Sequence, residues 1–335
     1  MNKNIFITGA EGFIGSHLLE QLAKNGNYNI KALVLYNFRS EAGWLNVIDK
    51  RIVNNTQIIM GDIRDYDYIL KHTKNSDIVV NLAALIGIPY SYDAPKSYID
   101  TNVVGTYNIL QASLKNNVQK VIQTSTSEVY GNMNFSDKFS ENSFQYAQSP
   151  YAATKISSDQ LSNSYFSSYD LPVTILRPFN TYGPRQSERA IIPTVINQIL
   201  KNQKKLKLGN LYASRDLNYI KDTIQGFMKV INSNKKIAGE SFNIGSGFKV
   251  TINDLVARIK KLMNSNIEVS FDKSRARPKK SEVEGLLCNS NKAKKILNWK
   301  PKYAGSKGLN DGLKETINWF IKNKKNYNFN KSYIK

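Results

Sequence analysis

The sequence is poor in the residues that build disulfides and metal sites. Its 335 residues include one cysteine, Cys288, and two histidines, His17 and His72. A single cysteine cannot form a disulfide within the chain, so a reducing cytoplasm is the expected location. These three residues form no cluster with metal-ligand spacing, and no metal is expected.

The sequence also lacks a long hydrophobic run. No uncharged stretch approaches the roughly 20 apolar residues of a membrane-spanning helix, and the N-terminus shows no signal-peptide cleavage pattern. We therefore expect no membrane partner.

Acidic residues are few, with 26 Asp and Glu against 47 Lys and Arg and a formal net charge of +21. Such an excess is typical of nucleic-acid-binding proteins. Here the basic residues are spread along the chain, and the longest clusters, at 201–207, 275–280 and 322–326, are short. Because of this dispersion, we expect no nucleic-acid partner. A positive field also attracts phosphorylated small molecules, so the charge alone does not decide the class of partner.

Short apolar runs alternate with helical patterns in the first half of the chain. Helical spacing of apolar residues appears at 12–26, 107–117 and 151–166. Continuous apolar strands that alternate with helices predict an α/β fold, with a doubly wound parallel sheet covered on both faces. The runs that predict strands are 4–9, 29–36, 56–62, 77–84, 120–126 and 172–178.

The alternation changes near residue 180. A helical pattern at 251–264 is mixed with short strands at 241–245 and 267–271, and no low-complexity linker precedes them. We predict a dinucleotide-binding domain at 1–178 and a smaller α/β substrate domain at 179–335, with some exchange of chain between them. A ligand is expected in the cleft between the two.

A glycine-rich loop follows the first predicted strand. In TGAEGFIG, Gly9, Gly12 and Gly15 lie between this strand and the first helix. Glycine permits the tight turn and lets backbone N–H groups approach a pyrophosphate, whose charge the helix N-terminus favours. This placement predicts the dinucleotide-binding loop of a Rossmann fold.

The end of the second strand bears on the choice of dinucleotide. An acidic residue there would bind the ribose 2′-hydroxyl of NAD, but the strand ends in Tyr36 and Asn37. NAD is the expected cofactor. NADP stays open as an alternative, because Arg39 could meet its 2′-phosphate. Asp62, after the third strand, is either an adenine contact or the N-cap of the next helix.

A tyrosine and a lysine lie one helical turn apart in SPYAATK. Tyr151 and Lys155 therefore share a face of the predicted helix. A nearby ammonium lowers the pKa of a tyrosine, so that Tyr151 can take a proton from a sugar hydroxyl. Thr126, at the end of the preceding strand, can hydrogen-bond the same oxygen.

These motifs resemble those of the extended short-chain dehydrogenases/reductases, the nucleotide-sugar epimerases and dehydratases. The resemblance covers nearly the whole chain and includes TGAEGFIGSHL, NLAAL, TNVVGTYNIL, TSTSEVYG, SPYAATK, RPFNTYGPRQ and SRDLNYIKD. It implies that Thr126, Tyr151 and Lys155 form the hydride-transfer triad. It also implies a homodimer in which segments 95–115 and 150–168 of each subunit build a four-helix bundle.

The resemblance further implies two sets of binding residues. The cofactor contacts would be Gly9, Gly12, Phe13, Ile14, Gly15, Asn37, Arg39, Asp62, Ile63, Leu82, Ala83, Ala84, Asn102, Thr124, Tyr151, Lys155 and Pro178. The substrate contacts would be Tyr90, Asn180, Arg185, Arg215 and Arg277. Arginine suits this task because its guanidinium can bind a phosphate through two parallel hydrogen bonds.

Glu128 argues against a 4-epimerase, but the Ser127–Glu128 pair is also similar to that of UDP-glucuronate decarboxylases and does not by itself separate dehydration from decarboxylation. If the strand continues, Thr126 and Glu128 face the same way, which places a carboxylate beside the sugar. A ketone at C4 acidifies C5, so Glu128 can remove the C5 proton and water can be lost across C5–C6. Ser127 stands where several similar hexose dehydratases carry aspartate, so either Ser127 or Glu128 protonates the leaving hydroxyl.

Longer stretches narrow the resemblance. Segments 36–49, 85–103, 177–194 and 277–295 look like those of the N-acetylglucosamine-nucleotide 4,6-dehydratases of legionaminic acid biosynthesis. The expected enzyme is therefore a lyase that converts GDP- or UDP-N-acetylglucosamine to the 4-keto-6-deoxy sugar nucleotide. The alternatives are a UDP-glucuronate decarboxylase, which needs a cation near C6, a 4-epimerase, which needs no Glu128, and a non-catalytic dinucleotide sensor.

Overall fold

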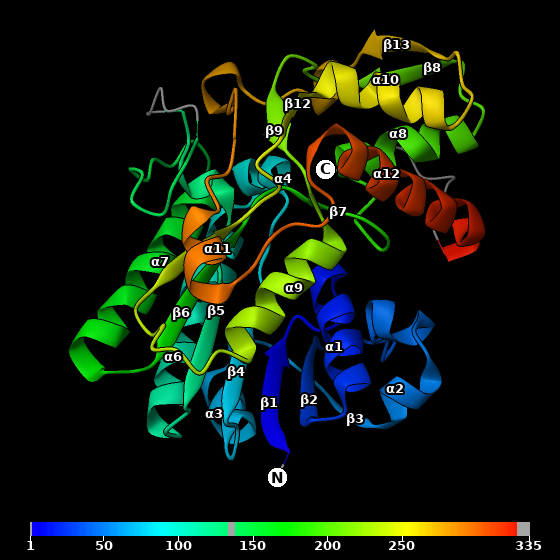
Figure 1. Cartoon of the computed structure of the whole chain (residues 1–335). Helices are drawn as coiled ribbons and strands as arrows, with labels where there is room; N and C mark the ends of the chain where they lie inside the picture. The colour runs from blue at the N-terminus through cyan, green and yellow to red at the C-terminus, as the bar shows by residue number, and fades with distance from the viewer. Residues whose placement is uncertain (1, 133–137, 327–335) are drawn as a thin grey trace.

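The computed structural model describes residues 2–132 and 138–326. Seven strands, all paired in parallel, form its central sheet in the order β11-β6-β5-β4-β1-β2-β3. Helices cover both faces of this sheet (Figure 1), which confirms the predicted doubly wound α/β fold. The strands are β1 Lys3–Thr8, β2 Tyr28–Leu35, β3 Thr56–Gly61, β4 Ile78–Asn81, β5 Lys120–Thr124, β6 Val173–Pro178 and β11 Ser241–Ile244.

The strands are recognisable in the sequence because both of their faces are buried. In β1, Ile5 and Ile7 pack into one hydrophobic core, whereas Phe6 between them packs into a second core on the other face. Successive side chains of a strand point to opposite faces, so a strand covered on both sides needs apolar residues throughout.

Two groups of helices supply the covers. Helices α1 (Phe13–Asn25) and α9 (Ile220–Ile231) pack against each other on one face. On the other face, α6 (Gly105–Lys115) packs between its two neighbours, α3 (Tyr66–Thr73) and α7 (Pro150–Tyr169). Within the described ranges, no helix is long and apolar enough to cross a membrane.

The helix expected over 95–115 has a π-helical section in its middle. It begins as α5 (Pro95–Tyr98), widens at Ile99–Val104 and continues as α6. π-Helical turns are rare and are frequently found at functional sites. Asn102 lies in this section and contacts α7, as described below.

A smaller layer of helices and strand pairs lies beyond the carboxyl ends of the main strands (Figure 1). Its helices are α8 (Ile191–Leu200), α10 (Ile252–Leu262) and α12 (Gly305–Lys322), which contact one another. Its strand pairs are β8 (Lys205–Leu208) with β13 (Glu268–Phe271), β9 (Ser214–Asp216) with β12 (Lys249–Thr251), and β7 (Thr181–Tyr182) with β10 (Asn218–Tyr219). The remaining helices are α2 (Lys50–Asn54), α4 (Ile88–Asp93) and α11 (Asn291–Leu297).

The second half of the chain also contributes to the main sheet. Strand β11 pairs with β6, and α9 packs on α1. The division into domains at 1–178 and 179–335, with exchange of chain between them, stays a prediction.

A buried ion pair joins α7 to β6. The carboxylate of Asp159 accepts hydrogen bonds from Arg177 Nε at 3.0 Å and from Ser125 Oγ at 2.9 Å. The side chains of Asp159 and Arg177 are 0% and 4% exposed. Because neither charge can reach water, each depends on the other for its stabilisation.

Asp159→Asn should lower the free energy of unfolding by about 3 kcal/mol, because it leaves a buried guanidinium without its counter-charge. Chemical denaturation followed by circular dichroism measures this loss. Asp49→Asn is the matched control, since it breaks an exposed ion pair with Arg51 and should have a far smaller effect. Similar losses in both variants would contradict the assignment.

Candidate active site

A cavity of about 1180 Å³ opens at the carboxyl ends of the central strands. Its lining comes from the segments that follow β1, β2, β3, β4, β5 and β6. The strand order reverses between β1 and β4. Doubly wound folds bind their ligands at this reversal, so the cavity is the candidate active site.

The glycine loop leaves backbone exposed to this cavity. Gly9 has a φ of 64°, and a Cβ atom there would lie 2.8 Å from the backbone nitrogen of Ala83. Gly12 is the N-cap of α1, and no side chain of the described ranges caps this helix. The first N–H groups of α1 therefore suit a pyrophosphate, and the loop fits a dinucleotide.

Most residues predicted to contact the cofactor line the cavity, but three do not. Asn37, Arg39 and Asn102 lie outside the lining, and their contact with the cofactor stays a prediction. Those in the lining are Gly9, Gly12, Phe13, Ile14, Gly15, Asp62, Ile63, Leu82, Ala83, Ala84, Thr124, Tyr151, Lys155 and Pro178.

Asn37 and Arg39 belong instead to the local structure of the loop after β2. The Asn37 amide donates to the carbonyl oxygens of Leu35 and Glu41 and accepts from the Glu41 backbone N–H. Arg39 is exposed and lies 3.6 Å from the Glu41 carboxylate. Both side chains therefore interact with residues of their own loop.

Asn102 holds two segments of the site together. Its Oδ1 accepts from the Leu85 backbone N–H at 2.8 Å, and its Nδ2 donates to Leu85 O and to Thr154 Oγ1. Thr154 lies on α7, beside Tyr151 and Lys155. Asn102 thus positions the helix that carries the predicted triad residues.

Asp62 lines the cavity, and its carboxylate is bound by Arg64. Arg64 Nε donates to both carboxylate oxygens at 2.9 and 3.0 Å, which lowers the pKa of Asp62. The N-cap of α3 is Asp65, which accepts from the Tyr68 backbone N–H. The N-cap alternative for Asp62 is therefore wrong, and its adenine contact stays a prediction.

The predicted catalytic residues meet in the same cavity. Thr126, Ser127, Glu128, Tyr151 and Lys155 all line it. β5 ends at Thr124, and Thr126 Oγ1 accepts from the Glu128 backbone N–H at 3.2 Å, which starts a 3₁₀ turn at Ser127–Val129. The expected continuation of the strand is wrong because of this cap, although its consequence, Thr126 and Glu128 at one site, holds.

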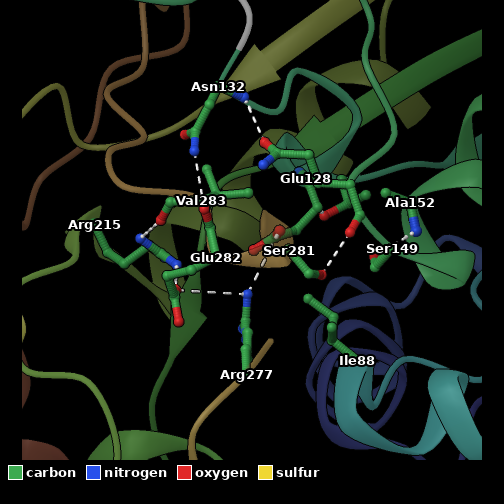
Figure 2. Close-up of polar contacts among 12 residues, drawn as sticks. Ile88, Glu128, Asn132, Ser149, Ala152, Arg215, Arg277, Ser281, Glu282 and Val283 are labelled. Atoms are coloured by element: carbon green, nitrogen blue, oxygen red, sulfur yellow. Dashed lines mark hydrogen bonds and ion pairs between the residues drawn. The ribbon is translucent and has the colours of Figure 1, made fainter. Parts of the chain in front are cut away.

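The start of α7 fixes Tyr151 and Lys155. Ser149 Oγ accepts from the Ala152 backbone N–H (Figure 2). Tyr151 therefore lies in the capped first turn of α7. Burial raises the pKa of Tyr151, and a hydrogen bond with Thr126 opposes this only in part. Burial also lowers the pKa of Lys155 to about 8, while its ammonium donates to Thr124 O.

The expectation of a lowered pKa for Tyr151 is therefore wrong for this arrangement, since the net direction is upward. Desolvation of the phenolate outweighs the other influences on Tyr151.

Two arginines gather on the Glu128 side of the cavity (Figure 2). Arg277 Nη1 lies 3.9 Å from Glu128 Oε2 and 4.0 Å from Glu282 Oε1. Arg215 Nη2 donates to the same Glu282 oxygen at 3.0 Å, and its Nη1 donates to Val283 O. Glu282 thus serves as a shared counter-ion for both arginines, which lie outside the lining itself.

The other predicted substrate residues, Tyr90, Asn180 and Arg185, line the cavity. Arg185 is also tied to α1, because its guanidinium donates to Glu20 Oε2 at 2.6 Å and lies against the His17 ring. Burial and the neighbouring Arg185 lower the pKa of His17 to about 3. This ion pair fixes Arg185 from the protein side, and its contact with substrate stays a prediction.

Sequence reasoning missed Glu11 and the segment that packs on it. Glu11, Trp44 and Val47 line the cavity, and the Trp44 backbone N–H donates to Glu11 O at 3.0 Å. The available signals were an acidic residue inside the glycine loop and Gly43 directly before a tryptophan.

The comparisons with known proteins agree with this geometry. The family model described as GDP-mannose 4,6 dehydratase matches residues 6–312. The chain belongs to this family. This family lies within the extended short-chain dehydrogenases/reductases, which confirms the resemblance to that larger family.

Similar proteins differ in the reactions that their names describe. The dTDP-D-glucose 4,6-dehydratase of Homo sapiens is 30% identical, over 97% of this chain and 92% of that protein. The UDP-N-acetyl-alpha-D-glucosaminuronate decarboxylase of Bacillus cytotoxicus is 32% identical, over 96% and 98%. The crystal structure of UDP-glucuronic acid 4-epimerase from Bacillus cereus, with UDP-glucuronic acid and NAD, has a TM-score of 0.86 and 31% identity, covering 95% and 99%.

Lys155→Met should stabilise the protein at pH 7 by about 2 kcal/mol. Because the pKa of Lys155 is about 8 in the folded chain and 10.5 ordinarily, the unfolded chain holds this proton more tightly. The ionised ammonium therefore opposes folding by about 3 kcal/mol at pH 7, partly offset by its hydrogen bond. This cost falls as the pH rises above 8 and disappears above 10.5.

Urea unfolding at pH 7 and near pH 10 measures both parts of this prediction. Lys96→Met, at an exposed ion pair with Asp100, is the control and should show neither the gain nor its pH dependence. A loss of stability at pH 7 in Lys155→Met would contradict the sign.

Proposed function

We propose that this protein is an NAD-dependent sugar-nucleotide 4,6-dehydratase. The observation that carries the proposal is the presence of Glu128 in one cavity with Thr126, Tyr151 and Lys155. The triad alone serves oxidation at C4, whereas a carboxylate beside it serves elimination at the adjoining carbon. A 4,6-dehydratase among the relatives supports the proposed reaction, and a structural neighbour with bound NAD supports the proposed cofactor.

The residues divide the reaction between them. Tyr151, hydrogen-bonded to Thr126, accepts the proton of the C4 hydroxyl, and the Lys155 ammonium, one helical turn away on α7, would stabilise the phenolate that forms. The loop of Gly9, Gly12 and Gly15 would hold NAD, which would supply a reversible hydride acceptor for oxidation at C4 and reduction at C6. Glu128 removes the C5 proton, which the C4 ketone has acidified, and the C6 hydroxyl leaves as water after protonation by Ser127 or Glu128. C5 regains a proton, so the net change is the loss of one water.

The substrate that we propose is GDP- or UDP-N-acetylglucosamine, converted to its 4-keto-6-deoxy form for legionaminic acid synthesis. Arg215 and Arg277 would bind the pyrophosphate, since they share the Glu282 carboxylate and Arg277 lies 3.9 Å from Glu128 Oε2. The support for the amino sugar is the resemblance of segments 36–49, 85–103, 177–194 and 277–295.

Decarboxylation of a UDP-hexuronic acid is the second candidate. It needs a cation near C6 of the sugar, and Arg277 lies 3.9 Å from Glu128 Oε2. One relative is named a UDP-N-acetyl-alpha-D-glucosaminuronate decarboxylase. In that reaction the C4 ketone makes a β-keto acid, which loses carbon dioxide without removal of the C5 proton.

Mass spectrometry of the products separates these reactions. The purified protein is incubated separately with GDP-N-acetylglucosamine, UDP-N-acetylglucosamine and UDP-glucuronic acid. Loss of one water from an acetamido sugar, without net reduction of NAD, supports dehydration and names the base. Loss of carbon dioxide from UDP-glucuronic acid alone would overturn the proposal.

Glu128→Gln should lower kcat for dehydration by a factor of about 10² to 10⁴, because it removes the base for the C5 proton. Oxidation at C4 needs only the triad, so reduced cofactor should accumulate when substrate is added. Rapid absorbance measurements detect this signal.

The control for this variant is Glu284→Gln, at an exposed position two residues after Glu282 and outside the cavity lining. It should keep the wild-type rate and accumulate no reduced cofactor. A well-folded Glu128→Gln variant with nearly full activity would exclude the mechanism.

We also propose that the protein is a homodimer through segments 95–115 and 150–168. Ile99, Val104 and Tyr107 are 50%, 40% and 44% exposed along the first segment, an apolar surface that a partner subunit would cover. Size-exclusion chromatography with light scattering should give about twice the monomer mass of 37.9 kDa. A pure monomer at micromolar concentration would contradict this.

A further inference from the structure

β2 ends without an acidic residue of its own, yet a carboxylate lies at its end. Glu11 belongs to the glycine loop between β1 and α1 and lines the cavity. Its Oε1 accepts a hydrogen bond from the backbone N–H of Leu35, the last residue of β2, at 3.0 Å. The loop after β1 thus supplies the negative charge that β2 itself lacks.

The second oxygen of this carboxylate is unsatisfied. Glu11 Oε2 is buried and has no hydrogen-bond partner within residues 2–132 and 138–326. Burial raises the pKa of Glu11, against the lowering effect of the Leu35 N–H. A buried acceptor without a donor costs free energy, so a hydroxyl group that enters the cavity beside Oε2 would be stabilised.

The surrounding backbone holds Glu11 in this position. The Trp44 N–H donates to Glu11 O, and Gly43, with a φ of 51°, packs so closely that a Cβ atom would lie 2.9 Å from the same oxygen. The arginines of this region, Arg39 and Arg64, are already paired with Glu41 and Asp62. Glu11 is therefore a fixed acceptor whose charge they do not neutralise.

We propose that Glu11 binds the adenosine ribose of the dinucleotide and selects NAD over NADP. In doubly wound folds an acidic residue at the end of β2 accepts from the ribose 2′-hydroxyl, and Glu11 Oε2 takes that place here. A 2′-phosphate would instead meet a carboxylate of like charge, which disfavours NADP. This inference rests on the proposed use of NAD.

Calorimetric titration of purified, nucleotide-free protein with NAD and with NADP tests the selection. Glu11→Gln keeps the shape of the side chain and removes its charge, so the Kd for NAD should rise at least about tenfold, and the preference for NAD over NADP should fall by a similar factor. Glu41→Gln, in the loop after β2 but outside the cavity, is the control and should change neither value. Thermal unfolding checks that each variant is folded.

An NAD analogue without the adenosine 2′-hydroxyl tests the contact itself. The wild type should bind this analogue about tenfold more weakly than NAD, whereas Glu11→Gln should bind the two almost equally. Loss of folding alone cannot produce this pattern.

The results distinguish the role of Glu11 from the proposed function of the protein. Tight NAD binding by a folded Glu11→Gln variant, with the NADP preference and the analogue penalty of the wild type, would overturn the role of Glu11 alone. Failure of the wild type to bind either dinucleotide would overturn the proposed function together with this inference.

Discussion

A chain of buried hydrogen bonds fixes the carboxyl ends of β1, β4 and β5 relative to one another, and the active site depends on this alignment. Thr8 Oγ1 donates to Asn81 Oδ1 at 2.7 Å and accepts from the backbone N–H groups of Leu82 and Ala83. Asn81 Nδ2 donates in turn to Gln123 Oε1 at 2.9 Å. Because these groups have no access to water, a slip of one strand would leave several of them unpaired. These hydrogen bonds thereby fix the relative positions of the glycine loop, the loop after β4 and the Thr126 turn, which all line the cavity.

The amino-acid sequence predicts the parts of this architecture that follow from local pattern. Two-sided burial makes β1 and its neighbours continuous apolar runs, and the spacing of Tyr151 and Lys155 alone places them on one helix face. The glycine loop is recognisable because Gly9 needs a positive φ and close approach to Ala83. Each of these signals is contained within a few residues.

Features that depend on distant segments could not be read in the same way. The hydrogen-bonding groups of Asn37 are used by its own loop, and those of Asn102 by Leu85 and Thr154, which no spacing in the sequence reveals. The raised pKa of Tyr151 results from burial by segments far away in the chain. Glu11 reaches the end of β2 only because the fold brings the first loop there.

Strand β11 has a consequence for the order in which this protein folds. It closes the edge of the sheet at β6, yet it comes from residues 241–244, more than sixty positions later in the chain. Until that segment has left the ribosome, β6 presents unpaired backbone N–H and C=O groups at an open edge of the sheet. Synthesis of the first 178 residues therefore yields an incomplete sheet, whose open edge is prone to aggregation until β11 pairs with it.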